Sequence, residues 1–281
     1  MIDIGNKQVS VHLSGGGQSA VCLARCLEWY GNDKVTAVFA NTNTEAPDLY
    51  DFLDAIEKRF QIDIVRLNND GKNIWDVFDK AGVISIRTGM SACKASLELK
   101  HKPLAKYMLE SHKPDTTVIA LGLSPYEPER QAKHHTRLAP YEVIYPLNVA
   151  PKLSDCEVID ELETLGLPVP DAYRKGYTHN NCGGGCVLAG VKQWAGLLED
   201  YPSRYAWHEE RERQWRAKGR DFTILRDQSN KQVKPYTLQQ LREDIEAGRQ
   251  SPGDFRSGCG CMIVDGLQQL SIFDVLRQEA S

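Results

Sequence analysis

The feature that most constrains the fold of this 281-residue chain is the alternation of short apolar runs with amphipathic segments in its first half. The strand-like runs are Val9–Leu13, Lys34–Ala40, Ile62–Leu67 and Thr116–Leu121. The helix-like segments are Ser19–Tyr30, Pro47–Phe60 and Leu97–Ser111, the last of which Pro103 must start or kink. Because consecutive parallel strands need a crossover, this alternation predicts an α/β fold with a parallel sheet and helices on both faces.

The second half of the chain has a different pattern, with several prolines between residues 146 and 172 and few strand signals. Helices are expected over Ser154–Leu165, Trp194–Lys218 and Thr237–Gly248, where Thr237 suits the N-cap position. The change of pattern predicts two parts. Residues 1–150 form a nucleotide-type α/β domain, and residues 151–281 form a smaller, mostly helical, cysteine-bearing region.

Composition limits the partners and the compartment. The chain has 34 Lys and Arg against 38 Asp and Glu, which excludes a uniformly basic nucleic-acid binder but not a local basic groove. The sequence shows neither a basic segment before an apolar stretch nor a run of about 18 apolar residues. We therefore expect a cytoplasmic protein with no membrane segment. In that compartment its eight cysteines suit metal binding or thiol chemistry better than disulfides.

A glycine-rich loop, Ser14-Gly15-Gly16-Gly17-Gln18-Ser19, lies between the first predicted strand and the first predicted helix. Glycines permit a tight turn and close approach of a ligand, and free N–H groups at a helix start favour an anion. A plain strand-to-helix turn and a dinucleotide loop are both compatible with this pattern. The dinucleotide loop needs an acid at the tip of the second strand, which here ends in Ala40-Asn41-Thr42-Asn43-Thr44-Glu45 without one. A Walker loop is excluded, since no Gly-Lys-Ser/Thr follows.

A third interpretation rests on a resemblance carried by four segments in register. The loop resembles the PP-loop of the adenine nucleotide alpha-hydrolase superfamily, Ser-Gly-Gly-x-Asp-Ser, although Gln18 stands where most members carry Asp and Gly17 where many carry Lys. The other segments resemble the phosphoadenosine phosphosulfate (PAPS) reductase branch. They are Val38–Glu45, similar to its second-strand motif, Cys93–Pro103, similar to Cys-Thr-x-x-Leu-Lys-x-x-Pro with a slightly altered spacing, and Gly122–Arg130, similar to Gly-x-x-x-x-Glu-x-x-Arg.

This resemblance spans residues 9–150 and implies a Rossmann-like sheet that binds an adenine nucleotide. It implies that the nucleotide lies on Ser14, Gly15, Gly16, Gly17, Gln18, Ser19 and Asn41, and that substrate or phosphate groups contact Lys100, Glu127 and Arg130. ATP or a related nucleotide is the implied ligand, and Mg²⁺ is the expected companion of its phosphates. From the residues alone, basic side chains after strand ends suit anions, but exposed ones commonly form only a solvated surface.

Four of the eight cysteines lie in two glycine-rich segments, Asn180–Cys186 and Ser257–Cys261. Thiolates among glycines can converge on one metal because the backbone bends freely there. The first pair is spaced Cys-x3-Cys, which fits zinc, whereas the Cys-x-Cys spacing of the second is tight for it. In the resembled family Cys93 occupies the place of a cluster ligand. A [4Fe–4S] cluster is therefore expected, with zinc or no metal as alternatives, on four of the five residues Cys93, Cys182, Cys186, Cys259 and Cys261.

Together these patterns predict a PAPS-reductase-like enzyme that uses an adenine nucleotide. An acceptor would attack the α-phosphate of ATP, pyrophosphate would leave, and the activated acceptor would enter sulfur chemistry. One alternative is a sulfonucleotide reductase, which in this family needs a Glu-Cys-Gly-Leu-His-like tail that Leu276–Ser281 lacks. Another is a non-catalytic nucleotide- or nucleic-acid-binding module, which Gln18 motivates. The acceptor stays open among tRNA, DNA and a small molecule.

Overall fold

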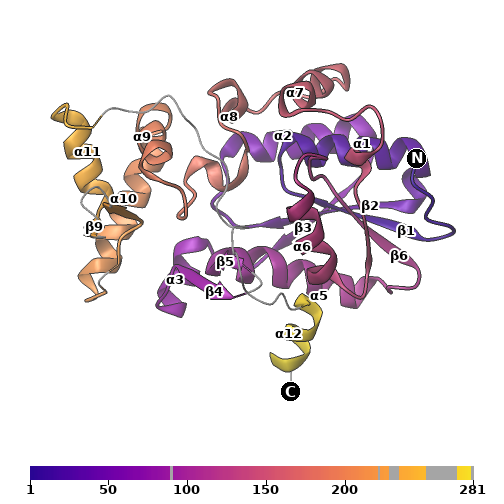
Figure 1. The fold of residues 1–281 in the computed structure, drawn as a ribbon, viewed down its shortest axis with the longest axis horizontal. Coiled ribbons are helices and arrows are strands. Elements are labelled where there is room, and N and C mark those ends of the chain that lie inside the picture. The colour runs from indigo at the N-terminus through magenta and orange to yellow at the C-terminus, as the bar shows by residue number, and fades with distance from the viewer. Residues whose placement is uncertain (89–90, 221, 228–233, 251–270, 280–281) are drawn as a thin grey trace.

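The computed structural model describes residues 1–88, 91–220, 222–227, 234–250 and 271–279. Five parallel strands form the main sheet in the order β3-β2-β1-β6-β7 (Figure 1). They are β1 (Gln8–Leu13), β2 (Val35–Asn41), β3 (Ile64–Asn68), β6 (Thr117–Leu121) and β7 (Glu142–Ile144). This sheet confirms the Rossmann-like α/β fold. The strand β7 is not among the predicted ones, because three residues carry too little pattern.

Two helical layers cover the sheet (Figure 1). One layer contains α1 (Gly17–Tyr30), α2 (Pro47–Phe60) and α7 (Asp155–Thr164), and the other contains α5 (Lys102–Ser111), α6 (Pro128–Leu138) and α12 (Ile272–Glu279). The side chains of the strands alternate between the layers. Val9, Val11 and Leu13 of β1 belong to the first core, and Ile119 and Leu121 of β6 belong to the second. Each helical layer therefore has its own apolar core against the sheet.

A third core joins α3 (Ile74–Ala81) to α9 (Val191–Asp200), α10 (Pro202–Ala217) and α11 (Leu238–Glu246). Its largest side chains, which are buried, are Trp75, Trp194, Tyr205 and Trp215. The single helix expected over Trp194–Lys218 is wrong, because the structure has α9 and α10 on either side of Tyr201. Pro202 begins the second helix, since proline has no N–H to donate in a helix interior.

The remaining elements are short. They are η1 (Asn32–Lys34), β4 (Ser85–Thr88), β5 (Ser91–Cys93), α4 (Lys94–Ser96), the π-helix η2 (Leu97–His101), η3 (Pro146–Asn148), α8 (Asp171–Arg174), η4 (Asn181–Gly184), β8 (Leu225–Asp227) and β9 (Lys234–Tyr236). The pairs β4–β5 and β8–β9 are antiparallel. None of the described helices combines the length and apolarity needed to cross a membrane.

The three cores do not divide at residue 150. The first contains Val158 and Leu162 of α7, the second contains Ile272 and Phe273 of α12, and the third joins α3 to the helices after residue 190. Each core thus takes side chains from both parts of the chain. The division into residues 1–150 and 151–281 stays a prediction.

Candidate functional site

The glycine-rich loop lies at the carboxyl end of β1, where the sheet changes the side on which its helices follow. The helix after β1, α1, packs in the first core, and the helix after the adjacent strand β6, α6, packs in the second (Figure 1). Ligands of open α/β sheets bind at such a switch point, outside the carboxyl ends of the strands. The fold therefore places the loop where a nucleotide phosphate is expected.

Two serine hydroxyls close the turn of the loop. The Ser19 hydroxyl donates to the carbonyl oxygen of Gly16 at 2.8 Å, and it accepts from the N–H and the hydroxyl of Ser14, both at 3.2 Å. Gly15 has a φ of +80°, and a Cβ at this position would lie 2.5 Å from Cδ1 of Leu49 in α2. Only glycine combines that backbone conformation with the close approach of α2.

The end of β6 touches the first turn of α1 backbone to backbone. A Cβ on Gly122 would lie 2.5 Å from the carbonyl oxygen of Gln18 and 2.5 Å from Cα of Ser19. A backbone contact cannot be relieved by rotating a side chain, so a larger residue at position 122 must displace the start of α1. The glycine that begins the segment Gly122–Arg130 therefore sets the position of the loop.

Helix α7 packs directly against the loop residues that depart from the resembled motif. A Cβ on Gly17 would lie 3.0 Å from Val158 and 3.1 Å from Leu162, which leaves little room for a side chain. Gln18 donates from Nε2 to Oδ1 of Asp155, in the first turn of α7, at 2.7 Å. Positions 17 and 18 are thus both in contact with α7, and a carboxylate from α7 stands beside position 18.

Two further residues of the second half reach the loop. The N–H of Gly17 donates to the hydroxyl of Tyr173 in α8 at 2.9 Å, and Asn180 donates from Nδ2 to the carbonyl oxygen of Gly15 at 3.3 Å. Burial raises the pKa of Tyr173, so its hydroxyl stays protonated. Asn180 is fully buried, and its Oδ1 has no hydrogen-bond partner among the described residues. The loop is therefore covered by residues far away in the sequence.

Asn41, at the end of β2, makes three hydrogen bonds within the protein. Its Nδ2 donates to Oδ1 of Asn43, and its Oδ1 accepts from the N–H of Asn43 and the hydroxyl of Tyr50, each at 2.9 Å. These bonds shape the turn after β2. The structure thus places Asn41 at the carboxyl edge of the sheet next to the loop strand, and it gives the side chain a role in that turn.

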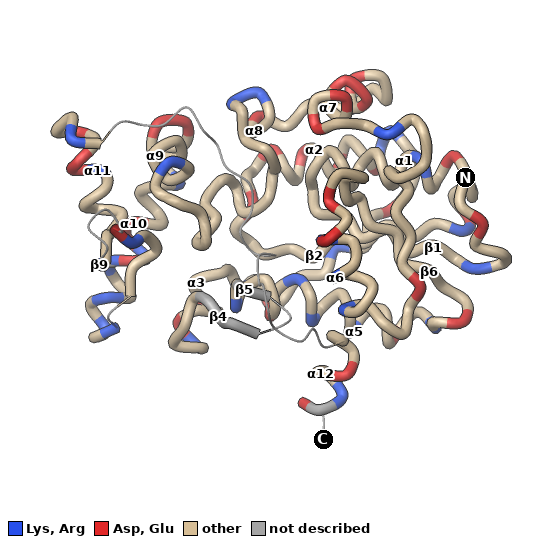
Figure 2. Tube along the Cα trace, in the orientation of Figure 1, with Lys and Arg blue, Asp and Glu red and all other residues tan. Residues whose placement is uncertain are grey.

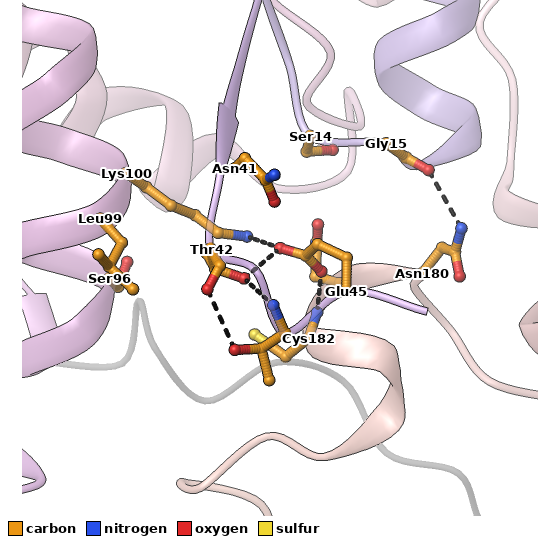
Figure 3. Close-up of polar contacts among 12 residues, drawn as sticks. Ser14, Gly15, Asn41, Thr42, Glu45, Ser96, Leu99, Lys100, Asn180 and Cys182 are labelled. Atoms are coloured by element: carbon orange, nitrogen blue, oxygen red, sulfur yellow. Dashed lines mark hydrogen bonds and ion pairs between the residues drawn. The ribbon is translucent and has the colours of Figure 1, made fainter. Parts of the chain in front are cut away.

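Glu45 organises the junction between the two halves of the chain (Figure 3). Its side chain is completely buried. Oε1 accepts from the Thr42 hydroxyl at 2.9 Å and pairs with Nζ of Lys100 at 3.2 Å, and Oε2 accepts from the N–H of Cys182 at 2.6 Å. A buried carboxylate requires such partners. Lys100, which the resemblance places at the substrate, is therefore held by a buried carboxylate at the end of β2.

Arg204 of α10 reaches the same junction from the helical half. Its guanidinium donates to the carbonyl oxygens of Thr44, of Glu45 at 3.2 Å and of Gly183 at 3.0 Å. Burial lowers the pKa of Arg204, and the charges of Glu45 and Cys182 act in the opposite direction. One side chain thus ties the turn after β2 to η4.

Glu127 and Arg130 form an ion pair at the start of α6, the helix that follows β6. Nη1 of Arg130 lies 2.6 Å from Oε1 of Glu127, and Oε2 of Glu127 accepts from the N–H of Ser124 at 3.2 Å. The side chains are 37% and 33% exposed, so the pair is accessible from solvent. The loop, Asn41 and the Glu127–Arg130 pair therefore lie at or beyond the ends of three adjacent strands, β1, β2 and β6. Lys100 lies in η2 and reaches this edge through its ion pair with Glu45.

The predicted cluster ligands are described only in part, because Cys259 and Cys261 lie outside the described residues. Cys93, at the end of β5, and Cys186 belong to the same apolar core, and Cys182 lies in η4 with a φ of +54°. In the part of the chain that the structure describes, no group of three or more His, Cys, Asp or Glu residues is arranged to hold a metal ion. The described residues do not form a metal site by themselves, and the cluster stays a prediction.

Glu45, Tyr173, Asn180 and Arg204 are absent from the site predicted from sequence. Glu45 lies inside the segment Val38–Glu45 that resembles the family. It stands four residues beyond the end of β2, where no periodic pattern indicates that a side chain is buried. Asn180 begins the glycine-rich segment Asn180–Cys186 but is not a predicted site residue, and Tyr173 and Arg204 belong to no motif. All three meet the loop or the turn after β2 across 156 to 165 residues of sequence. Only the tertiary packing of the second half brings them there.

The loop, its switch-point position and the order of the strands define a nucleotide-binding α/β domain. The family model of the phosphoadenosine phosphosulfate reductase domain matches residues 8–138, from β1 to the end of α6. This segment belongs to that domain family and so to the PP-loop ATP pyrophosphatase superfamily, whose members are enzymes. The comparison with curated proteins finds no significant match.

Proposed function

We propose that the chain is a PP-loop enzyme that uses ATP to activate an acceptor, with release of pyrophosphate, for sulfur chemistry. The observation that carries this proposal is the position of the loop. It lies at the switch point of a sheet in the PAPS reductase domain family, and the hydroxyls of Ser14 and Ser19 hold its turn. The backbone N–H groups of such a turn and the start of α1 favour the phosphates of a nucleotide.

In the proposed reaction an oxygen of the acceptor attacks the α-phosphorus of ATP. The new P–O bond forms as the bond to the bridging oxygen breaks, pyrophosphate leaves with that electron pair, and the acceptor proton passes to solvent. The loop and the start of α1 stabilise the negative charge on the leaving group. Lys100, positioned by Glu45, and Arg130, positioned by Glu127, supply hydrogen-bond donors for phosphate oxygens, although each charge is matched by its carboxylate.

We extend the proposal to a [4Fe–4S] cluster held by four of the five predicted cysteines. Its support is that Cys93 and Cys186, distant in sequence, share one core, and that Cys182 is placed beside the turn after β2 by its bond to Glu45. Such a cluster would organise sulfur for the activated acceptor. Anaerobic purification should give iron and acid-labile sulfide in about a 1:1 ratio. Zinc at about one equivalent per chain, without iron, would contradict the cluster.

The charges of the helical half do not select a nucleic-acid acceptor. Acidic and basic residues stand side by side along α10 and α11 (Figure 2). Several of these basic side chains pair with carboxylates, as in Arg213–Glu210 at 2.7 Å and Arg242–Glu209 at 2.9 Å. A phosphate backbone binds best to basic side chains whose charge is not already matched. We therefore place tRNA and DNA beside small molecules as acceptors to be tested.

Pyrophosphate release is the direct test of the proposed reaction. Purified protein with Mg²⁺ and ATP should release pyrophosphate when the true acceptor is present, and a Ser14→Ala, Ser19→Ala double variant should release far less. Sulfite formed from PAPS with a thiol donor would instead identify a sulfonucleotide reductase. Nucleotide affinity with no product from any acceptor would identify a binding module.

A further inference from the structure

The central strand of the sheet has polar side chains on one face. Ser10 and His12 of β1 point toward the α5–α6 layer, because Val9, Val11 and Leu13 alternate with them into the opposite core. Strands inside a parallel sheet are ordinarily apolar on both faces. Here the hydroxyl of Ser10 and Nε2 of His12 are buried without a hydrogen-bond partner among the described residues. Polar groups that break the apolar pattern in this way indicate a site.

Two more histidines and an arginine converge on His12. His101 ends the π-helix η2, a type of turn that is frequent at functional sites, and His134 and Arg137 lie on α6. Nε2 of His101 lies 3.5 Å from Nη1 of the buried Arg137 and 3.4 Å from the Ser96 hydroxyl. The three histidines interact electrostatically with one another. We refer to His12, His101, His134 and Arg137 as the basic cluster.

The basic groups around these histidines, rather than their burial, favour a bound anion. Burial, followed by neighbouring basic groups, lowers the pKa of His12 to about 4 and that of His101 to about 3, and it lowers the pKa of His134 in the same way. The groups that act on the three histidines are all basic, namely Lys100, His112, Arg130, Arg137 and the histidines themselves. The nearby carboxylates of Glu45 and Glu127 are paired with Lys100 and Arg130.

We propose that the basic cluster binds a tetrahedral oxyanion, the phosphate or sulfate group of the second reactant. Such an anion accepts hydrogen bonds from Nε2 of His12, Nδ1 of His134 and the Arg137 guanidinium. A metal ion does not fit, because Arg137 repels it and the described residues hold no set of three ligands. The oxyanion site stands on its own contacts, whereas its assignment to the second reactant rests on the proposed reaction with ATP.

Binding of the oxyanion takes up protons. Because the pKa values of all three histidines are lowered, their imidazoles are neutral in the free protein at neutral pH, and an adjacent anion raises these pKa values so that they become charged donors. Affinity therefore rises as the pH falls from about 8 to about 6. Sulfate, which stays fully ionised in this range, would show no such dependence if it were bound only by Lys or Arg side chains.

Calorimetric titration of the full chain with inorganic phosphate, and separately with sulfate, tests the site. Repeating it in buffers of different ionisation enthalpy measures the protons taken up, and we expect uptake for at least one of the two anions. His134→Gln and Arg137→Gln should weaken binding about tenfold or more. His135→Gln, at an exposed neighbour on α6, is the matched control and should leave binding unchanged. Imidazole nitrogen NMR of the unaltered protein, in which phosphate or sulfate should shift the His12 and His134 signals, needs no variant to fold.

Three outcomes overturn the proposal in separable ways. Absence of binding, or binding without proton uptake and insensitive to His134→Gln, removes the oxyanion site. Displacement of the bound anion by a non-hydrolysable ATP analogue removes the assignment to a second reactant, whereas binding of both at once supports it. The Ser14→Ala, Ser19→Ala variant should keep its affinity for the anion even when it loses pyrophosphate release, so failure of the ATP reaction is distinguished from failure of this site.

Discussion

The α/β half and the helical half contribute to the candidate site in different ways. The α/β half, which contains the matched segment 8–138, supplies the loop after β1 and the charged residues after β2 and β6. The helical half supplies contacts that cover and fix them, from Tyr173 to Gly17, from Asn180 to Gly15, and from Arg204 to the turn after β2. The comparison indicates that the loop is formed locally but closed by distant residues.

The largest expected effect on stability and ATP binding comes from the backbone contact between Gly122 and α1, which lies within the α/β half. Gly122→Ala pushes a Cβ against the backbone of α1, so we expect a loss of about 3 kcal/mol in the free energy of unfolding and loss of ATP binding. Gly190→Ala is the control, because a Cβ there meets nothing within 4 Å. Chemical denaturation and ATP titration measure both effects. Full stability and affinity in Gly122→Ala would show that the contact does not set the loop.

A second prediction concerns how the free energy of unfolding depends on pH through His208, a buried histidine of the helical half. Burial and then Arg204 lower the pKa of His208, in the helical half, to about 3. The unfolded chain therefore binds a proton near pH 6.5 that the folded chain refuses, and stability is lost as the pH falls through that value. Between about pH 7 and about pH 5, urea unfolding should show a loss about 2 kcal/mol smaller in His208→Gln than in the unaltered chain. Equal losses would contradict the assignment.

The ion pair between Lys100 and Glu45, at the junction of the halves, should contribute a similar or slightly smaller amount to the free energy of unfolding. Lys100→Met leaves the buried Glu45 without its ion-pair partner, which should cost about 2 kcal/mol of stability. Adding Glu45→Gln should recover part of the loss. Lys106→Met, at an exposed pair on α5, should change stability by less than about 0.5 kcal/mol. If the two lysine variants are equally stable in urea titrations, the junction does not depend on this pair.

Removing one covering contact from the helical half should have opposite effects on stability and ligand affinity. Tyr173→Phe removes the acceptor for the Gly17 N–H and should cost about 1 kcal/mol of stability. If a phosphate takes the same N–H, ATP should bind up to about fivefold more tightly, since it no longer competes with the phenol. Tyr126→Phe, at an exposed position, is the control. Weaker ATP binding in Tyr173→Phe would mean that the hydroxyl contacts the nucleotide instead.

The smallest expected effect concerns the altered loop position. Gln18→Asp places a carboxylate against Asp155 and should cost about 0.5 kcal/mol, because both groups are near solvent. Asp155→Asn in the same chain restores a donor and an acceptor and should recover that cost. A double-mutant cycle by thermal or chemical unfolding measures the coupling. Additive effects of the two changes would show that α7 does not hold Gln18.

Most of the sheet and the loop could be predicted from the sequence. The buried strands Val35–Asn41 and Thr117–Leu121 have continuous apolar patterns, and Pro47 and Pro103 mark first turns of helices. The three-residue strand β7 has too few positions for any period. Pro202 separates α9 from α10. The charged and aromatic sequence on both sides of it has the same helical pattern, so the pattern predicts one helix instead of two.

The candidate site could be predicted where residues lie at a strand end or inside a segment that resembles the family. Ser14 to Ser19 and Asn41 lie at strand ends, and Lys100 and Arg130 lie farther along in segments of the resembled family. The structure gives each of them defined contacts. Glu45 and Asn180 depend on burial, which arises only when the helical half packs over the sheet. The basic cluster combines one strand, a π-helix and α6, and no linear spacing relates its members.

Titration of Mg²⁺-ATP by calorimetry tests most directly whether both halves form one nucleotide site. We expect the unaltered chain to bind one ATP, and Ser14→Ala and Asn180→Ala, one from each half, to weaken binding about tenfold each. The free energy of unfolding of each variant should be measured alongside. Absence of ATP binding by the unaltered chain, or full affinity in a folded Asn180→Ala variant, would contradict the shared site.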